Sequence, residues 1–89
     1  MTDWVADIRV LLKPSVNDPQ GLSIRNALRT LGFDGVEDVR AGKLIQLLVS
    51  APSREAAKQM VDAMCAQLLA NPVIETYAFT LDEEPARVL

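Results

Sequence analysis

At the middle of the chain lies the run Asp38-Val39-Arg40-Ala41-Gly42-Lys43-Leu44-Ile45-Gln46-Leu47. Its pattern predicts a β-hairpin: a short strand ending at Arg40, a tight turn at Ala41-Gly42, and a longer apolar strand that continues to Val49. Gly42 suits the turn because a residue without Cβ adopts positive φ at low cost. One helix-like segment precedes this hairpin and one follows it, so we expect it to be the centre of the fold.

The segment before the hairpin predicts a strand followed by a helix. Residues 4–13 alternate between apolar and other side chains, as in a half-buried strand, and Pro14 ends the strand because proline cannot donate to a ladder. Asp18 followed by Pro19 is typical of a helix start, with an N-cap residue and a proline at the first helical position. Gly32 is placed to end this helix. The helix carries a stripe that we expect to face the core: Ile24, Ala27, Leu28 and Leu31.

The segment after the hairpin predicts a second helix and a last strand. Ser53 is positioned to cap the helix, and Asn71-Pro72 is expected to close it. Residues 73–81 then alternate as in a half-buried strand. The second helix carries its own apolar stripe, which consists of Ala57, Met60, Val61, Met64 and Leu68, flanked by Cys65 and Leu69.

The resulting order, βαββαβ, predicts an α+β protein with a ferredoxin-like antiparallel sheet of four strands and both helices on one face. We expect residues 1–82 to form one domain and residues 83–89 a polar tail. The other face of the sheet is short of charge, and we expect it to lie in a homo-oligomer interface. Its expected members are Leu11, Val39, Leu44, Leu48, Ile74, Thr76, Ala78 and Thr80.

The composition limits the possible functions. The chain has 89 residues, of which 49% are hydrophobic and 24% charged, as in an ordinary small globular domain. Its net charge of −3 argues against a nucleic-acid partner, and no apolar run approaches the length of a membrane span. With no histidine and one cysteine, the chain lacks the commonest general base and the usual zinc ligands. We therefore expect a cytoplasmic protein without a catalytic or metal-binding residue.

Several residues still invite a functional interpretation. Arg40 and Lys43 flank the predicted turn and could bind a phosphate or a carboxylate-bearing partner, or could be solvated charges on a loop tip. Asp18 could lie beside an anion at the helix start, although capping that helix is the favoured role. Cys65 has no histidine to activate it, so we interpret it as a small buried hydrophobe. The acids at 82–84 are interpreted as part of a charged tail.

Seven segments occur in a characteristic order: Leu12-Lys13, Asp18-Pro19-Gln20-Gly21, Ala27-Leu28, Leu31-Gly32-Phe33, Val36-Glu37-Asp38-Val39-Arg40, Gly42-Lys43 and Leu69-Ala70-Asn71-Pro72-Val73-Ile74-Glu75-Thr76-Tyr77. Together they closely resemble the PurS family, the small subunit of phosphoribosylformylglycinamidine synthase (FGAM synthase). The resemblance extends to Leu81. It departs from the family pattern at Pro14-Ser15, where the family often has a glycine-containing turn, and in residues 84–89.

This resemblance implies a non-catalytic assembly subunit of a ligase in de novo purine biosynthesis. In the family, PurL binds ATP and magnesium and carries out the amidation, while PurQ hydrolyses glutamine and supplies ammonia. PurS is required for assembly of the two and forms homodimers or higher homo-oligomers. The resemblance therefore implies no cofactor in this chain, with PurL, PurQ and further copies of itself as partners. As a hypothesis, the motif residues without an evident core role contact the larger subunits: Arg40, Gly42, Lys43, Asn71 and Pro72.

The main alternative is an amino-acid-binding regulatory module of the ACT type, which has the same element order and also dimerises. Gly21 is loosely compatible with the glycine that such modules place before the first helix, but the segments quoted above are not. A small acylphosphatase-like enzyme is disfavoured because the loop after the first strand has no arginine. An RNA-binding sheet is disfavoured by the acidic charge and by an aromatic content of 4%.

Overall fold

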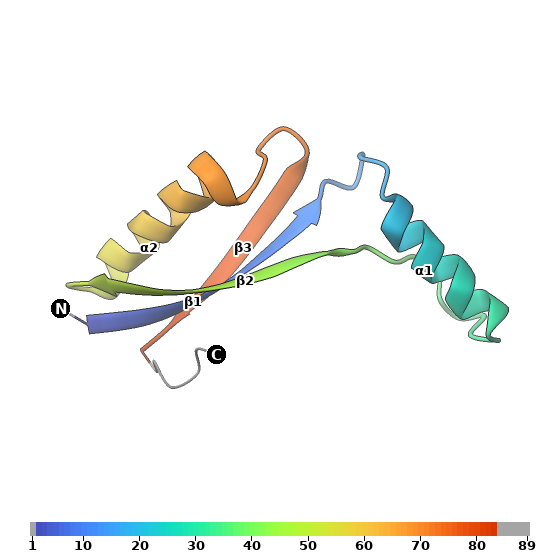
Figure 1. The fold of residues 1–89 in the computed structure, drawn as a ribbon, viewed down its shortest axis with the longest axis horizontal. Coiled ribbons are helices and arrows are strands. Elements are labelled where there is room, and N and C mark those ends of the chain that lie inside the picture. The colour runs from blue at the N-terminus through green and yellow to red at the C-terminus, as the bar shows by residue number, and fades with distance from the viewer. Residues whose placement is uncertain (1, 84–89) are drawn as a thin grey trace.

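The computed structural model describes residues 2–83, which form an antiparallel sheet and two helices (Figure 1). The last turn of the second helical segment is π-helical. In chain order the elements are β1 (Thr2–Leu12), α1 (Pro19–Thr30), β2 (Gly42–Ala51), α2 (Arg54–Met64), the π-helical turn η1 (Cys65–Leu69) and β3 (Glu75–Asp82). The predicted tail at 83–89 lies, apart from Glu83, outside the described residues.

The sheet has the order β2-β1-β3, and β1 pairs antiparallel with both of its neighbours. At the centre of β1, Ile8 faces Ile45 of β2 on one side and Phe79 of β3 on the other. Because these positions share one face of the sheet, the apolar side chains of all three strands point to the same side. The predicted α+β class, with a ferredoxin-like antiparallel sheet, is confirmed.

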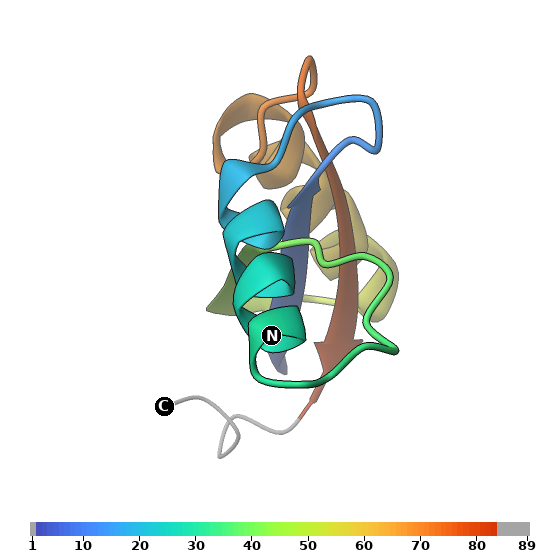
Figure 2. The same ribbon diagram turned by 90° about the vertical axis from the view of Figure 1, so that its right-hand side faces the viewer.

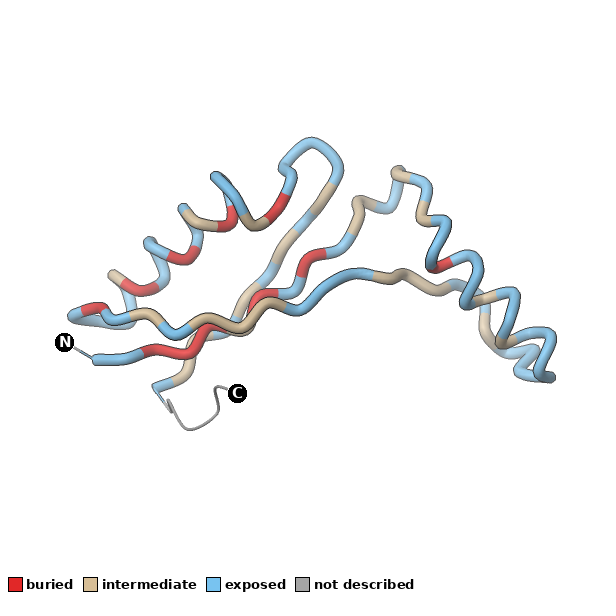
Figure 3. The backbone as a smooth tube through the Cα atoms, viewed as in Figure 1, coloured by how far each residue is buried: buried red, intermediate tan, exposed pale blue. Residues whose placement is uncertain are grey.

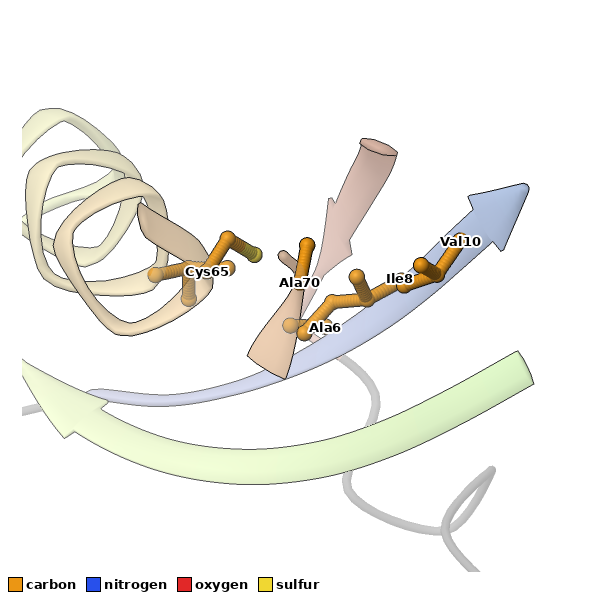
Figure 4. Packing of buried hydrophobic residues seen from close by; sticks show 6 residues of the cluster. Ala6, Ile8, Val10, Cys65 and Ala70 are labelled. Atoms are coloured by element: carbon orange, nitrogen blue, oxygen red, sulfur yellow. The ribbon is translucent and has the colours of Figure 1, made fainter. Parts of the chain in front are cut away.

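The core lies between this face and α2. Ile8 and Val10 of β1 are almost completely inaccessible to solvent, as are Val61 of α2 and Cys65 of η1. Figure 4 shows Ile8 and Val10 along β1 and Cys65 on the neighbouring helical segment. The spacing of four residues between Ala57, Val61 and Cys65 keeps these side chains on one helix face, which explains why this stripe is covered.

The helix boundaries follow the local signals in the sequence. Asp18 caps α1 and Ser53 caps α2, each accepting a hydrogen bond from a backbone N–H three residues later. Gly32 has φ of 101°, and the backbone N–H of Phe33 donates to the carbonyl of Leu28 at 3.1 Å. This is the Schellman motif, in which a glycine in the left-handed region allows backbone N–H groups after the helix to donate to its last carbonyl oxygens. The predicted starts and stops are confirmed.

The predicted hairpin is wrong. Residues 36–41 form no strand, and Gly42 is the first residue of β2 rather than part of a turn. The backbone N–H of Ala41 donates to the Asp18 carboxylate at 2.8 Å instead of to a neighbouring strand. A Cβ on Gly42 would lie 2.2 Å from the carbonyl oxygen of Val10, so glycine is required here by the close approach of β1. The described sheet therefore has three strands rather than the four predicted.

The placement of α1 also differs from the prediction. Residues 13–41, which we call the arm, project beyond the end of the sheet, and α1 makes no extensive contact with any strand or with α2 (Figures 1 and 2). Most of α1 is exposed (Figure 3). In the expected core stripe, Ile24 is 40% and Leu31 74% exposed. The prediction of two helices on one face holds only for α2 within a single copy, because the arm carries α1 away from the sheet.

The face opposite α2 is partly apolar, as predicted. Leu11, Leu44 and Leu48 are exposed on it. Asp7 lies among them, and its carboxylate accepts a hydrogen bond of 2.8 Å from the Gln46 amide. Val39 and Ile74, which were also expected on this face, lie outside the strands. Its role as a homo-oligomer interface stays a prediction.

Candidate functional site

We call the place where residues 14–18 meet residues 39–42 the arm base. It is held together by Arg40, one of the residues predicted to contact a partner. Its guanidinium donates to two carbonyl oxygens of the loop after β1, from Nη1 to Val16 at 3.1 Å and from Nη2 to Pro14 at 2.6 Å. These bonds join the segment that leaves the sheet to the segment that returns to it. Two of the five N–H donors of Arg40 are used in these bonds, so Arg40 has a structural role at the arm base, and its use as a phosphate ligand stays a prediction.

Asp18 is the second tie in the arm base. Oδ1 of its carboxylate accepts from the N–H of Gly21 at 3.0 Å, and Oδ2 accepts from the N–H of Ala41 at 2.8 Å. One side chain thus caps α1 and fixes the segment before β2. The two backbone hydrogen bonds, with a smaller contribution from the nearby Arg40 charge, hold the pKa of the Asp18 carboxyl below its usual value.

This lowered pKa predicts how the arm base responds to acid. An unfolded aspartate has a pKa of about 3.9, so a carboxyl with a lower folded pKa stabilises the fold fully above that value. The contribution is lost as pH falls through the folded pKa. Wild type should therefore be more stable than Asp18→Asn at neutral pH, and the difference should shrink below about pH 5.

Urea unfolding of both proteins between neutral and acidic pH measures this difference. Asp34→Asn, which removes one carboxylate at an exposed turn residue, is the matched control and should change the free energy of unfolding at neutral pH by no more than about 0.5 kcal/mol. A constant difference between wild type and Asp18→Asn at every pH would contradict the assignment.

Gly21 and Gly42 allow the arm base to close. A Cβ on Gly21 would lie 2.3 Å from the carbonyl oxygen of Val39 and 2.6 Å from Oδ2 of Asp18. Gly42 meets the backbone of Val10 equally closely. Both glycines therefore permit backbone approach rather than positive φ.

The second predicted contact region, Asn71-Pro72, forms the corner between η1 and β3. The side-chain oxygen of Asn71 accepts from the N–H of Val73 at 3.0 Å, and its backbone carbonyl accepts from the N–H of Glu75 at 2.7 Å. The Glu75 carboxylate in turn accepts from the N–H of Asn71 at 2.7 Å. Asn71 thus shapes a rigid exposed corner, since an Asx side chain can replace a backbone group in a turn.

The structure brings the two predicted regions to the same end of the sheet. Gly42 of β2 pairs with Leu11, which also pairs with Thr76 of β3. The N–H of Lys13 donates to the carbonyl of Ile74 at 2.8 Å, which ties the corner to the start of the arm. The two regions therefore lie on either side of the end of β1. They are separated by two inter-strand distances, about 10 Å. We call the surface formed by Lys43, the Asn71-Pro72 corner and the arm base the arm-end surface.

The arm-end surface has a hollow beside it. A hollow of about 340 Å³ lies beside the arm base, lined in part by Asn17, Leu22 and Asp38. No group of three His, Cys, Asp or Glu side chains within residues 2–83 is arranged to hold a metal ion. Over the same residues, no helix has the length and apolar character needed to cross a membrane.

Cys65 and Tyr77, whose pKa values are raised, lie in and beside the core. Cys65 is fully buried, and burial, together with the nearby Asp62 charge, raises the pKa of its thiol. The interpretation of Cys65 as a buried hydrophobe is confirmed, because a reactive thiol needs a lowered pKa and access. Tyr77 donates its hydroxyl proton to Asp62, and this hydrogen bond raises the pKa of the phenol. Neither residue belongs to the arm-end surface.

The sequence-based reasoning missed the two ties of the arm base. Asp18 was predicted as a helix cap, but not as a partner of Ala41. Arg40 was predicted as an exposed contact, but not as the donor to Pro14 and Val16. These hydrogen bonds span 23 to 26 residues and end on backbone groups, which carry no side-chain pattern in a single sequence.

Comparison with known proteins identifies the relatives of this chain. Residues 5–83 match the family model described as "PurS: Phosphoribosylformylglycinamidine (FGAM) synthase". The phosphoribosylformylglycinamidine synthase subunit PurS of Synechocystis is 51% identical over 74 residues, which are 83% of this chain and 74% of that protein.

Two solved structures have the same fold. The first is PurS of Methanocaldococcus jannaschii, described as one of the subunits of formylglycinamide ribonucleotide amidotransferase in the purine biosynthetic pathway. It has a TM-score of 0.80 at 36% identity, over 91% of this chain and 98% of that one. The second is a chain of the PurLQS structure from Thermotoga maritima, with a TM-score of 0.85 at 35% identity, over 92% of this chain and 100% of that one. The family match covers nearly the whole sequence, and the chain belongs to the PurS family.

Proposed function

We propose that this chain is the non-catalytic assembly subunit of phosphoribosylformylglycinamidine synthase in purine biosynthesis. The observation that carries the proposal is the arm-end surface, which presents the exposed Lys43 and the corner shaped by Asn71 at the same end of the sheet. The similarity to a chain of the PurLQS structure supports PurL and PurQ as its partners. The family match favours this function over an amino-acid-binding regulator.

The mechanism is positional. By holding a glutaminase subunit against an ATP-dependent synthetase subunit, the chain keeps the ammonia source close to the ammonia acceptor. Proximity of this kind gives a large effective concentration without any new chemistry. ATP and magnesium would be bound by PurL, so this chain would need no cofactor. The complex would act in the cytoplasm, and the chain would enter it as a homodimer or homotetramer.

The five residues predicted to contact partners take different roles in this proposal. Lys43 is exposed at the start of β2, and Asn71-Pro72 is exposed at the corner, so these three would touch PurL or PurQ directly. Arg40 and Gly42 would act as positioning residues. Arg40 holds the arm base together through its hydrogen bonds, and Gly42 allows the backbone of β1 to approach β2 closely.

Reconstitution tests the proposal. PurL and PurQ are mixed with glutamine, ATP, magnesium and formylglycinamide ribonucleotide, with and without this chain, and product formation is followed. We expect glutamine-dependent amidation only in the complete mixture, whereas amidation from added ammonia should need PurL alone. Full glutamine-dependent activity without the chain would remove the proposed function.

The same assay tests the contact surface. Lys43→Glu should weaken complex formation about tenfold or more, because reversing a charge at a contact places like charges together. Lys58→Glu makes the same change on the exposed side of α2 and is the matched control. If both variants were equally active and co-purified equally well with PurL and PurQ, Lys43 would not be a contact residue. The proposed assembly role would still stand.

A further inference from the structure

The outer edge of β3 has no neighbouring strand in the described sheet, whose order is β2-β1-β3 (Figure 2). Natural edge strands avoid pairing with other chains by carrying charged residues or proline. Residues 77–81, which form the centre of β3, contain neither. This segment therefore presents an unprotected edge to which a further strand can be added.

The hydrogen bonds around β3 show which of its backbone groups point outward. The N–H of Lys13 donates to the carbonyl of Ile74, its direct partner when the register of β1 and β3 is extended by one residue. Because bonding alternates along an antiparallel pair, the even-numbered residues of β3 direct their backbone groups at β1 and the odd-numbered residues direct them outward. In agreement, the carbonyl of Leu81 accepts a hydrogen bond from a side chain of α2. The N–H and C=O groups of Tyr77 and Phe79 therefore point to the outer edge.

A hollow of about 670 Å³ lies along this edge, between β3 and α2. The five consecutive residues 77–81 all line it. A hollow on one face of a sheet would be lined by alternate residues of a strand, because successive side chains point to opposite faces. The hollow therefore opens along the edge itself, where an added strand would lie.

The α2 side of the hollow carries a row of three charged residues at a spacing of four, which are Arg54, Lys58 and Asp62. At one end, Arg54 donates to the carbonyl of Leu81 at 3.1 Å. At the other end, Asp62 accepts from the hydroxyl of Tyr77. Four helical residues advance about 6 Å, and two strand residues advance about 6.8 Å. The row therefore stays in step with alternate residues of β3, and its middle lies opposite the middle of the edge.

Lys58 occupies that middle position, opposite Phe79, which also lines the hollow. The Lys58 side chain is exposed and makes no hydrogen bond or ion pair within residues 2–83. A carboxylate placed here would gain a cation without displacing another partner. A carboxylate at the Tyr77 end would instead meet Asp62. The charge pattern thus favours an acidic group at the centre of the edge.

We propose that the outer edge of β3 binds an extended segment of another polypeptide as an added strand, with a carboxylate side chain of that segment against Lys58. Backbone hydrogen bonds to Tyr77 and Phe79 supply the affinity, and the carboxylate fixes the register, as is general for strand addition. A second copy of this chain fits less well. Two β3 edges paired about a two-fold axis at Phe79 would bring the Lys58 ammonium groups of both copies together.

This edge is separate from the arm-end surface. Phe79 lies about 14 Å along β3 from Glu75, where the corner ends. The proposed occupant is accordingly a polypeptide other than PurL and PurQ, and the inference does not rest on the assembly function.

A peptide titration followed by NMR tests the proposal. The probe is Thr-Val-Thr-Glu-Thr-Val-Thr, blocked at both ends, which places its glutamate and both valines on one side of a strand. Added to the ¹⁵N-labelled full chain, it should shift the amide signals of Tyr77 and Phe79 saturably. We expect a Kd in the millimolar range, because a short flexible peptide loses conformational entropy on binding. Hydrogen exchange at these two amides should slow several-fold near saturation, whereas the Ala78 amide, which faces β1, should change little.

A charge exchange tests the role of Lys58. A second peptide with lysine in place of glutamate should bind the wild-type chain about fivefold more weakly. Lys58→Glu should reverse this preference, and Lys43→Glu, which makes the same change outside the hollow, should keep it. The two lysine variants therefore serve as controls for each other in the peptide assay and in the assembly assay.

Four results would overturn the proposal. The first is the absence of saturable shifts at Tyr77 and Phe79, or shifts without slower exchange, since neither is compatible with an added strand. The second is equal binding of the two peptides to the wild-type chain. The third is a change at these amides without peptide, either on raising the protein concentration or on removing residues 84–89, which would assign the edge to a second copy or to the chain itself. The fourth is loss of glutamine-dependent amidation in Lys58→Glu, which would assign the edge to the synthase complex. The first three results leave the proposed assembly function untouched.

Discussion

Replacing Ile8 by alanine should lower the free energy of unfolding by about 3–4 kcal/mol, one of the largest single effects available in this domain. Ile8 is completely buried at the centre of β1, where it lies between Ile45 and Phe79 in the sheet and packs in the cluster with Val61. Truncation removes three carbon atoms and leaves a cavity in a small core that has few ways to close it. A loss of this size is a large part of the roughly 5–15 kcal/mol that stabilises an ordinary domain.

Urea unfolding at one fixed protein concentration measures the Ile8→Ala effect, because self-association would otherwise shift the midpoint. Val73→Ala is the control, since Val73 is 75% exposed at the corner before β3. It should change the free energy of unfolding by no more than about 0.5 kcal/mol. Equal losses from the two variants would mean that the core does not lie under β1.

Replacing Gly21 by alanine should destabilise the arm, although alanine is the better helix former. In an exposed helix interior, this replacement would stabilise by about 1 kcal/mol. Here the added Cβ would stand 2.3 Å from the Val39 carbonyl oxygen, closer than any carbon atom can approach. Overpacking of this kind typically costs about 1–3 kcal/mol. The two contributions have opposite signs, and the close approach should dominate.

Gly35→Ala is the matched control for Gly21→Ala, because a Cβ at Gly35 would meet no atom within 4 Å. It should be neutral or slightly stabilising, since alanine restricts the unfolded chain. Hydrogen exchange at the Ala41 amide, which donates to Asp18, reports on the arm base separately from global unfolding. A Gly21→Ala protein as stable as wild type, with Ala41 still protected, would contradict the described packing.

Local signals were enough to predict where the elements begin and end. Asp18-Pro19, Ser53 and Gly32 each act on backbone groups within four residues, so a single sequence contains the whole interaction. The alternation in β1 was equally informative, because its apolar side chains pack against the helical segment of the same chain. The α+β class and the antiparallel sheet followed from these features.

The errors arose where one residue type serves two physical purposes. Gly42 was expected in a turn, but it serves a close backbone approach, and a sequence does not distinguish the two uses. The stripe through Ile24 and Leu31 was recognised correctly as a face that needs cover. Periodicity does not say where that cover comes from, and in the described fold α1 lies beyond the end of the sheet rather than on its face. Arg40 and Gly42 gained structural roles at the arm base. The partner contacts predicted for Arg40, Gly42, Lys43, Asn71 and Pro72 all stay predictions.

The ties made by Arg40 and Asp18 have a consequence for the thermodynamics of assembly. Ordering one backbone residue costs about 1–2 kcal/mol of conformational entropy, and an arm that became ordered only on contact would lose much of its binding energy in this way. Here the hydrogen bonds at the arm base order those segments while the single chain folds. Association then begins from a preorganised surface, and a contact of modest area can hold a partner firmly.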